Sequence, residues 1–177
     1  MIERGEYKYV NKNTGEECKM ELELGNITIL SGHYSASKAF HQIILGDYQV
    51  TRKYEHNLDK FLDNTSDAIS KYEFLKDEFD AFFFDGIGFF SPLRYRINVQ
   101  KLMTIVKNNK PKQFIICTND YLFLKNAYLQ SGNIGVDIRL IDFKSEDNVV
   151  QGNISEIWLG CYVEREAFGC YLVTKGK

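Results

Sequence analysis

The sequence predicts an α/β protein with a mostly parallel central sheet, flanking helices, antiparallel strands near the N-terminus and a β-hairpin at the C-terminus. The apolar runs at 80–85 and Gln113–Cys117 are short and continuous, as is typical of strands buried on both faces of a parallel sheet. Helical spacing of apolar residues fills the segment between them. Strand, helix and strand in succession indicate crossover connections between parallel strands.

The N-terminal third predicts two strands and a helix. Strict alternation from Lys19 to Leu24 predicts a half-exposed strand, and Gly25-Asn26 predicts a turn. Ile27 to Leu30 predicts a more buried strand, and we expect these two strands to form a hairpin. Helical spacing follows at 37–45. Three further segments complete this part of the prediction: a short strand at 47–53 and two charged helices between His56 and Phe79, divided near residue 65.

The rest of the chain continues the alternation of strands and helices within a single domain, 1–177. Ser91 as the N-cap and Pro92 at the first helical position predict a helix that runs to about residue 107. The remaining predicted elements are a helix at 120–128, a strand at 136–143 and a terminal hairpin of 157–163 with 168–173.

Composition limits the classes of function. The formal net charge of −2 gives no electrostatic reason to expect nucleic acid as a partner. No run approaches the roughly twenty apolar residues of a membrane helix, so we expect no membrane insertion. The four cysteines lack CxxC spacing, which favours a reducing, cytoplasmic setting. A disulfide between Cys161 and Cys170 across the terminal hairpin is the alternative.

The strongest functional pattern lies where the buried strand Ile27–Leu30 runs into a helix. Gly32 and Lys38 have the separation found in a phosphate-binding loop, in which backbone N–H groups wrap an anion and a lysine reaches the outer phosphates. Ser37 stands where that pattern has its second glycine. Ala39 stands where a Ser or Thr would hold magnesium. The candidate nucleotide-binding residues of this segment are Gly32, His33, Ser35, Ser37 and Lys38.

Two later strands end in polar residues that complete this candidate site. Phe82-Phe83-Phe84 leads into Asp85, which is the candidate magnesium ligand and the one candidate catalytic residue. Gln113–Cys117 leads into Thr118 and Asn119, and Asn119 is a candidate contact to the γ-phosphate. For each motif taken alone, an ordinary strand followed by a polar turn is the alternative interpretation.

The order of these three motifs resembles the ATP-binding heads of the ABC, SMC and AAA-type P-loop ATPases. The resemblance covers residues 19–143 and implies ATP, with magnesium, as the cofactor. It also implies a homodimer or a protein partner, because heads of this family pair. The chain departs from the family pattern at Ser37 and Ala39, at Gly86 in place of a catalytic Glu, and at Asn119 in place of a switch His. These departures predict little or no hydrolysis.

We therefore expect a degenerate, hydrolysis-deficient ATPase-like domain that binds nucleotide or acts as a scaffolding or regulatory subunit. An accessory protein of a bacterial system or a mobile element would fit this role. Two alternatives stay open: an active but divergent ATPase completed by a partner, and a protein-binding module that takes no nucleotide and no magnesium. The other histidines, His41 and His56, are expected on the surface or on a helix face.

Overall fold

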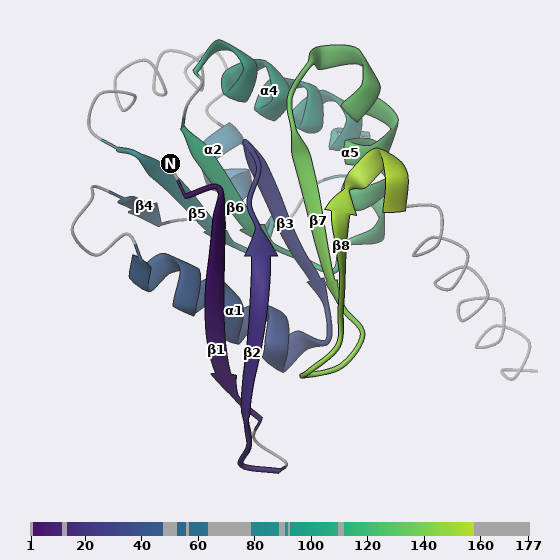
Figure 1. Ribbon diagram of the computed structural model, residues 1–177. Helices are drawn as coiled ribbons and strands as arrows, with labels where there is room; N and C mark the ends of the chain where they lie inside the picture. The colour runs from purple at the N-terminus through teal and green to yellow at the C-terminus, as the bar shows by residue number, and fades with distance from the viewer. Residues whose placement is uncertain are drawn as a thin grey trace, which may run out of the picture.

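The computed structural model describes residues 2–11, 14–47, 53–55, 57–63, 79–88, 91, 93–109 and 112–157 (Figure 1). These residues form two sheets and four helices that have assigned bounds. The elements in chain order are β1 (Arg4–Val10), β2 (Glu17–Glu23), β3 (Ile27–Gly32), α1 (Tyr34–Asp47), β4 (Lys53–Glu55), α2 (Leu58–Asp63), β5 (Ala81–Asp85), α4 (Tyr95–Asn108), β6 (Gln113–Cys117), α5 (Tyr121–Ile134), β7 (Ile138–Phe143) and β8 (Val149–Asn153).

The larger sheet is mostly parallel, as predicted. Its strand order is β4-β5-β6-β3-β7-β8, and only β8 runs antiparallel to its neighbour. Strand β3 therefore lies between β6 and β7, whereas β5 lies on the far side of β6. Strand β6 is buried along its whole length and β5 at every residue before Asp85, which explains their continuous apolar sequences.

Two apolar cores lie on the two faces of this sheet. Helices α2, α4 and α5 pack on one face, around side chains such as Phe82, Phe114 and Leu102. Helix α1 and the β1–β2 hairpin cover the other face, where Phe40 stacks on Phe143 at a centroid distance of 5.1 Å. Figure 1 shows α1 on the same side as the hairpin, with α4 and α5 beyond the sheet. The sheet is thus the middle layer of three.

The N-terminal antiparallel strands are present, but their predicted pairing is wrong. Strand β2 pairs with β1, with Tyr7 opposite Met20, and β3 pairs instead with β6 and β7 in the large sheet. Ile27 and Ile29 on β3 are fully buried. A strand buried on both faces needs a neighbour on each edge and a layer on each side, which a two-stranded hairpin does not provide.

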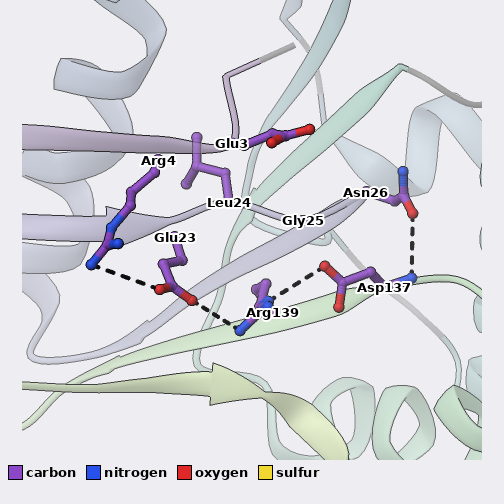
Figure 2. Close-up of a pocket in the computed structure, with 8 residues that line it drawn as sticks. All are labelled: Glu3, Arg4, Glu23, Leu24, Gly25, Asn26, Asp137 and Arg139. Atoms are coloured by element: carbon purple, nitrogen blue, oxygen red, sulfur yellow. Dashed lines mark hydrogen bonds and ion pairs between the residues drawn. The ribbon is translucent and has the colours of Figure 1, made fainter.

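A cavity of about 380 Å³ lies where the hairpin meets the large sheet (Figure 2). Four of its charged side chains, those of Arg4, Glu23, Asp137 and Arg139, are linked by ion pairs. Arg139 on β7 contacts Glu23 on β2 at 3.2 Å and Asp137 at 3.4 Å. Arg4 also lies 4.0 Å from Glu23. These ion pairs join β2 to β7 and give this cavity a structural role.

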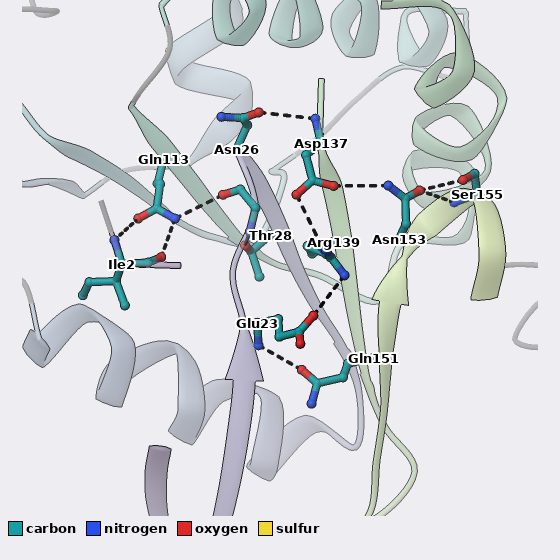
Figure 3. Close-up of polar contacts among 11 residues, drawn as sticks. Ile2, Glu23, Asn26, Thr28, Gln113, Asp137, Arg139, Gln151, Asn153 and Ser155 are labelled. Carbon is teal, nitrogen blue, oxygen red and sulfur yellow. Dashed lines mark hydrogen bonds and ion pairs between the residues drawn. The ribbon is translucent and has the colours of Figure 1, made fainter. Parts of the chain in front are cut away.

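Two glutamine side chains tie the hairpin to the sheet by binding backbone on both of their amide atoms (Figure 3). Gln113, fully buried, accepts from the Ile2 N–H at 2.9 Å and donates to the Ile2 carbonyl at 2.7 Å. Gln151 accepts from the Glu23 N–H at 3.0 Å and donates to the Glu21 carbonyl at 2.6 Å. Each side-chain amide pairs with backbone as a neighbouring strand would.

Several predicted boundaries differ from the structure. Helix α1 begins at Tyr34 rather than at residue 37, and α4 begins at Tyr95, because a turn from the Arg94 N–H to the Ser91 carbonyl precedes it. Ser91 is therefore not the N-cap. Strands β1 and β8 were not predicted. The predicted hairpin at 157–163 and 168–173 lies outside the described residues, apart from Ile157, which ends a short helical turn.

None of the described helices is long and apolar enough to cross a membrane.

We expect the two glutamine contacts to differ in their contribution to stability. Gln113→Leu leaves buried backbone groups without partners and should lower the free energy of unfolding by about 1–3 kcal/mol. Gln151→Leu should lower it by less than about 1 kcal/mol, because its partners are reached by water. Urea denaturation measures both changes. Equal losses for the two variants would contradict this account.

Candidate functional site

The candidate site lies at the C-terminal edge of the large sheet, at the point where connections leave in opposite directions. The connection after β3 runs through α1 on one face toward β4. The connection after the adjacent β6 runs through α5 on the other face and reaches β7 beyond β3. Such a switch point leaves a crevice between the two connections, and ligands of open α/β sheets bind there.

A pocket of about 210 Å³ occupies this crevice. It brings together residues from three strand ends that are far apart in the sequence. Lys38 comes from the first turns of α1, Asp85 from the end of β5 and Asn119 from the segment after β6. The full lining is Tyr34, Ser37, Lys38, Asp85, Gly86, Cys117, Thr118 and Asn119.

The segment that resembles a phosphate loop in sequence is mostly helix in the structure. Strand β3 ends at Gly32 and helix α1 begins at Tyr34, so His33 alone lies between them. Ser37 lies in the helix, and its N–H donates to the His33 carbonyl at 2.9 Å. Among the described residues, only glycines have positive φ. Ser37 therefore does not adopt the left-handed conformation that a glycine-like role would require.

The connection between β3 and α1 is short because the backbone of Gly32 is held on both sides. The Gly32 N–H donates to Asn119 Oδ1 at 2.6 Å, and Asn119 Nδ2 donates to the Gly32 carbonyl at 2.9 Å. The next N–H, that of His33, donates to the Phe143 carbonyl at 2.7 Å. Asn119 is thus a partner of the backbone, and the N–H of Gly32 is already occupied.

Lys38 and Asp85 form an ion pair across the pocket. The Lys38 ammonium also lies 5.4 Å from the centroid of the Tyr34 ring. Burial lowers the pKa of Lys38, but the hydrogen bond and charge of Asp85 raise it by more, so the net shift is upward. Lys38 is therefore a permanent cation at neutral pH, and its charge is matched by Asp85.

Cys117 and Thr118 line the pocket floor and were not predicted as site residues. The Cys117 thiol is 6% exposed. Burial raises the pKa of Cys117, although Ser37 and the Lys38 charge partly oppose that shift. The thiol is therefore protonated and poorly nucleophilic at neutral pH. A polar residue directly after a buried strand was the signal in the sequence that pointed to Thr118.

The structure brings together four of the predicted site residues and separates the others from them. Ser37, Lys38, Asp85 and Asn119 line the pocket. Gly32 touches the site through Asn119, whereas His33 is exposed and, with Ser35, lies outside the lining.

His41 lies in helix α1, so of its two predicted placements the helix face holds and the surface does not. It is 2% exposed and meets the Phe83 ring edge-on at 5.7 Å, because α1 is buried by the hairpin on one side and by the sheet on another. His56 lies outside the described residues.

Among the described residues, neither a metal-binding cluster nor the larger cavity gives a second candidate site. Within the described ranges, no group of three or more His, Cys, Asp or Glu side chains is placed to hold a metal ion. The larger cavity beside the hairpin lies at the opposite edge of the sheet, and both of its cationic side chains, Arg4 and Arg139, are paired with carboxylates. We therefore place the candidate site at the smaller pocket.

No protein-family model, curated protein or solved structure matches this chain.

Gly32 and Gly86 form a matched pair for testing the packing at this edge. Both have a φ of +92°, which disfavours any residue with a Cβ. A Cβ on Gly32 would overlap the carbonyl oxygen of Phe143, whereas a Cβ on Gly86 would meet nothing within 4 Å. We expect Gly86→Ala to lower the free energy of unfolding by about 1 kcal/mol and Gly32→Ala by about 3 kcal/mol or more. Chemical denaturation checks the difference, which should vanish if the clash is absent.

A hydrogen bond between Tyr95 and Asp120 joins α4 to the start of α5. The Tyr95 hydroxyl, at the start of α4, donates to Asp120 Oδ2 at 2.7 Å. Asp120 is also the N-cap of α5, and its Oδ1 accepts from the Phe123 N–H at 2.8 Å. Burial, together with the hydrogen bond and charge of Asp120, raises the pKa of Tyr95 to about 12.

This contact should make stability depend on pH at the alkaline end. The folded state holds the phenolic proton above the ordinary pKa of 10.0, so the stabilisation is complete below that pH and is lost as pH rises toward about 12. At pH 7, Tyr95→Phe should lower the free energy of unfolding by about 1–2 kcal/mol. The difference between the two proteins should shrink between about pH 10 and 12. A difference that stays constant over this range would contradict the assignment.

Proposed function

We propose that this chain is a degenerate, hydrolysis-deficient ATPase-like domain that binds the phosphate end of a nucleotide weakly and acts through protein contacts. One observation carries the proposal. Lys38, Asp85 and Asn119 come from the three separate motifs that resemble a P-loop ATPase, and all three line one pocket at the switch point of the sheet. A chance resemblance in the sequence gives no reason for these three motifs to converge.

The pocket has the chemistry to attract an anion. The N-terminal end of α1 carries partial positive charge, and Lys38 adds a full one. Tyr34, Ser35 and Ala36 open the helix, and in the described part of the chain their N–H groups have no hydrogen-bond acceptor. A phosphate group entering here would compete with Asp85 for the Lys38 ammonium.

The size of the pocket supports the binding of a phosphate group rather than a whole nucleotide. Its volume of about 210 Å³ is below the range of about 300–1,000 Å³ typical of small-molecule sites. The base and sugar would therefore lie outside the pocket. Weak affinity follows, because few groups are buried with the ligand.

The residues at the motif positions lack the groups that ATP hydrolysis needs. Gly86 follows Asp85, so this position offers no carboxylate to activate water. Ala39 carries no hydroxyl for magnesium, and the Ser37 hydroxyl donates to the Tyr34 carbonyl at 3.1 Å within the helix. An active ATPase would need a partner to supply both functions, so the divergent-ATPase alternative has the least support.

Exposed apolar side chains around this edge support a role in protein contacts. Tyr34 is 67% exposed at the start of α1, Leu93 is 90% exposed before α4, and Leu122 is 40% exposed in the first turn of α5. Each follows one of the strands that end at the pocket. A partner or a second copy that covered this edge would bury these three residues.

A protein-binding module without nucleotide is the second candidate. The observation in its favour is the one-residue connection between β3 and α1, where the N–H groups of Gly32 and His33 are already bound. These groups cannot also wrap a phosphate.

The test is an ATP titration by calorimetry with and without magnesium, for the wild type and two lysine variants. Lys112 is the matched control, because it pairs with Asp80 at the other end of the sheet. We expect ATP to bind with a Kd of about 0.1–1 mM. Lys38→Ala should weaken binding at least about tenfold, the loss of one charge-assisted contact, whereas Lys112→Ala should not.

Magnesium should change the affinity little, and phosphate release should stay at the background rate. Absence of ATP binding at millimolar concentration would overturn the nucleotide part of the proposal in favour of the second candidate. Turnover that depends on Lys38 would overturn the assignment as hydrolysis-deficient.

A further inference from the structure

Among the described residues, strand β1 of the hairpin has a strand neighbour on one edge only. The small sheet contains β1 and β2, and β1 packs its inner face on α1. The far edge of β2 is covered, since Gln151 binds its backbone at Glu21 and Glu23. In the described part of the chain no strand pairs with the other edge of β1. An uncovered strand edge is a template for another strand.

The hydrogen-bond pattern identifies which backbone groups lie on that edge. The Leu24 N–H donates to the Glu3 carbonyl at 2.8 Å, and the Asn11 N–H donates to the Glu16 carbonyl at 2.8 Å. Odd-numbered residues of β1 therefore turn their backbone groups toward β2. The even-numbered residues present their N–H and C=O groups on the outer edge, and these residues are Arg4, Glu6, Lys8 and Val10.

The same four residues carry the exposed side chains of β1, and their charges alternate. Arg4 and Lys8 are cationic and Glu6 lies between them. Arg4 pairs with Glu21, and Lys8 pairs with Glu17 at 3.3 Å. Glu6 has no ion pair among the described residues.

The pairing register leaves like charges opposite each other within the hairpin. Glu6 faces Glu21, and Lys8 faces Lys19. Like charges directly opposite in a cross-strand pair are destabilising. The outer face of β1 is thus incompletely neutralised by β2, and Glu6 is the least compensated position.

We propose that the outer edge of β1 binds an extended segment of a partner protein as an added antiparallel strand. The segment would carry outward residues in the order apolar, acidic, basic, acidic, opposite Val10, Lys8, Glu6 and Arg4. Val10 is 58% exposed, so an apolar residue opposite it would cover its apolar surface. The backbone supplies affinity and the alternating charges select the sequence. Charges on this edge disfavour an apolar strand, which limits indiscriminate pairing.

The inner residues of the added strand also have apolar surroundings. Their side chains would lie on the same face of the sheet as those of Tyr7 and Tyr9, which are buried against α1. On α1, Ala39 and Ile43 pack against the same cluster and are only partly buried. An added strand with Val or Thr at its inner positions would lie beside this cluster.

The experiment uses the fluorescein-labelled peptide Val-Thr-Glu-Val-Lys-Thr-Glu and fluorescence anisotropy with the full chain. We expect saturable binding. Glu6→Lys should weaken it about fivefold, because an attractive cross-strand pair becomes repulsive. A peptide with Glu in place of its Lys should regain the lost affinity on this variant. Glu156→Lys, the same change at an exposed glutamate outside the hairpin, should leave binding unchanged.

N-methylated peptides test the edge directly. Methylation of the backbone nitrogen at the third or fifth peptide residue, which faces β1 in this register, should abolish binding. Methylation at the fourth residue, which faces away, should leave binding intact. Failure of the unmodified peptide to bind would overturn the proposal. So would equal loss for all methylated peptides, or equal affinity of the reversed sequence. Lys38→Ala should bind the peptide normally, so this test is independent of the nucleotide pocket.

Discussion

The candidate site depends on how the C-terminal end of β3 is held. Asn119 binds both backbone groups of Gly32, and the Phe143 carbonyl accepts from the His33 N–H. Together these bonds fasten the end of β3 to the strands on both of its sides. His33 alone then separates β3 from α1, so the Lys38 side chain projects from the second turn of the helix. This position brings the ammonium to Asp85 instead of into a wide loop.

Amide side chains that bind backbone groups recur in this protein. Gln113, Asn119 and Gln151 each donate and accept at the main chain of a segment remote in sequence. Such a side chain can close a strand edge where no further strand is available. Gln113 and Gln151 use it to fix the hairpin over α1, and Asn119 uses it to close the switch point. These amide contacts stabilise the fold, but the Asn119 side chain occupies the Gly32 N–H, which an anion would otherwise bind.

Strands β5 and β6 could be predicted from the sequence because burial on both faces is met there by continuous apolar runs. The runs Phe82–Phe84 and Phe114–Ile116 are of this kind. Strands β1 and β8 could not be predicted in the same way. In β1 only Tyr7 and Tyr9 face the core, and β8 is an edge strand that is stabilised by pairing with β7. The predicted pairing of β2 with β3 is wrong, because strands that are consecutive in sequence need not be neighbours in a sheet.

The residues of the candidate site could be predicted from their order along the chain, but their local conformation could not. The spacing from Gly32 to Lys38 is the same whether the segment is a loop or a helix. Ser37 decides between them: its Cβ disfavours a left-handed conformation, so the helix extends back to Tyr34. A serine at the position of the motif's second glycine is thus compatible with a helix over this segment and not with a phosphate-binding loop. On the proposed function, Lys38 and the end of α1 would bind an anion weakly through charge and position, and would not position a reacting phosphoryl group.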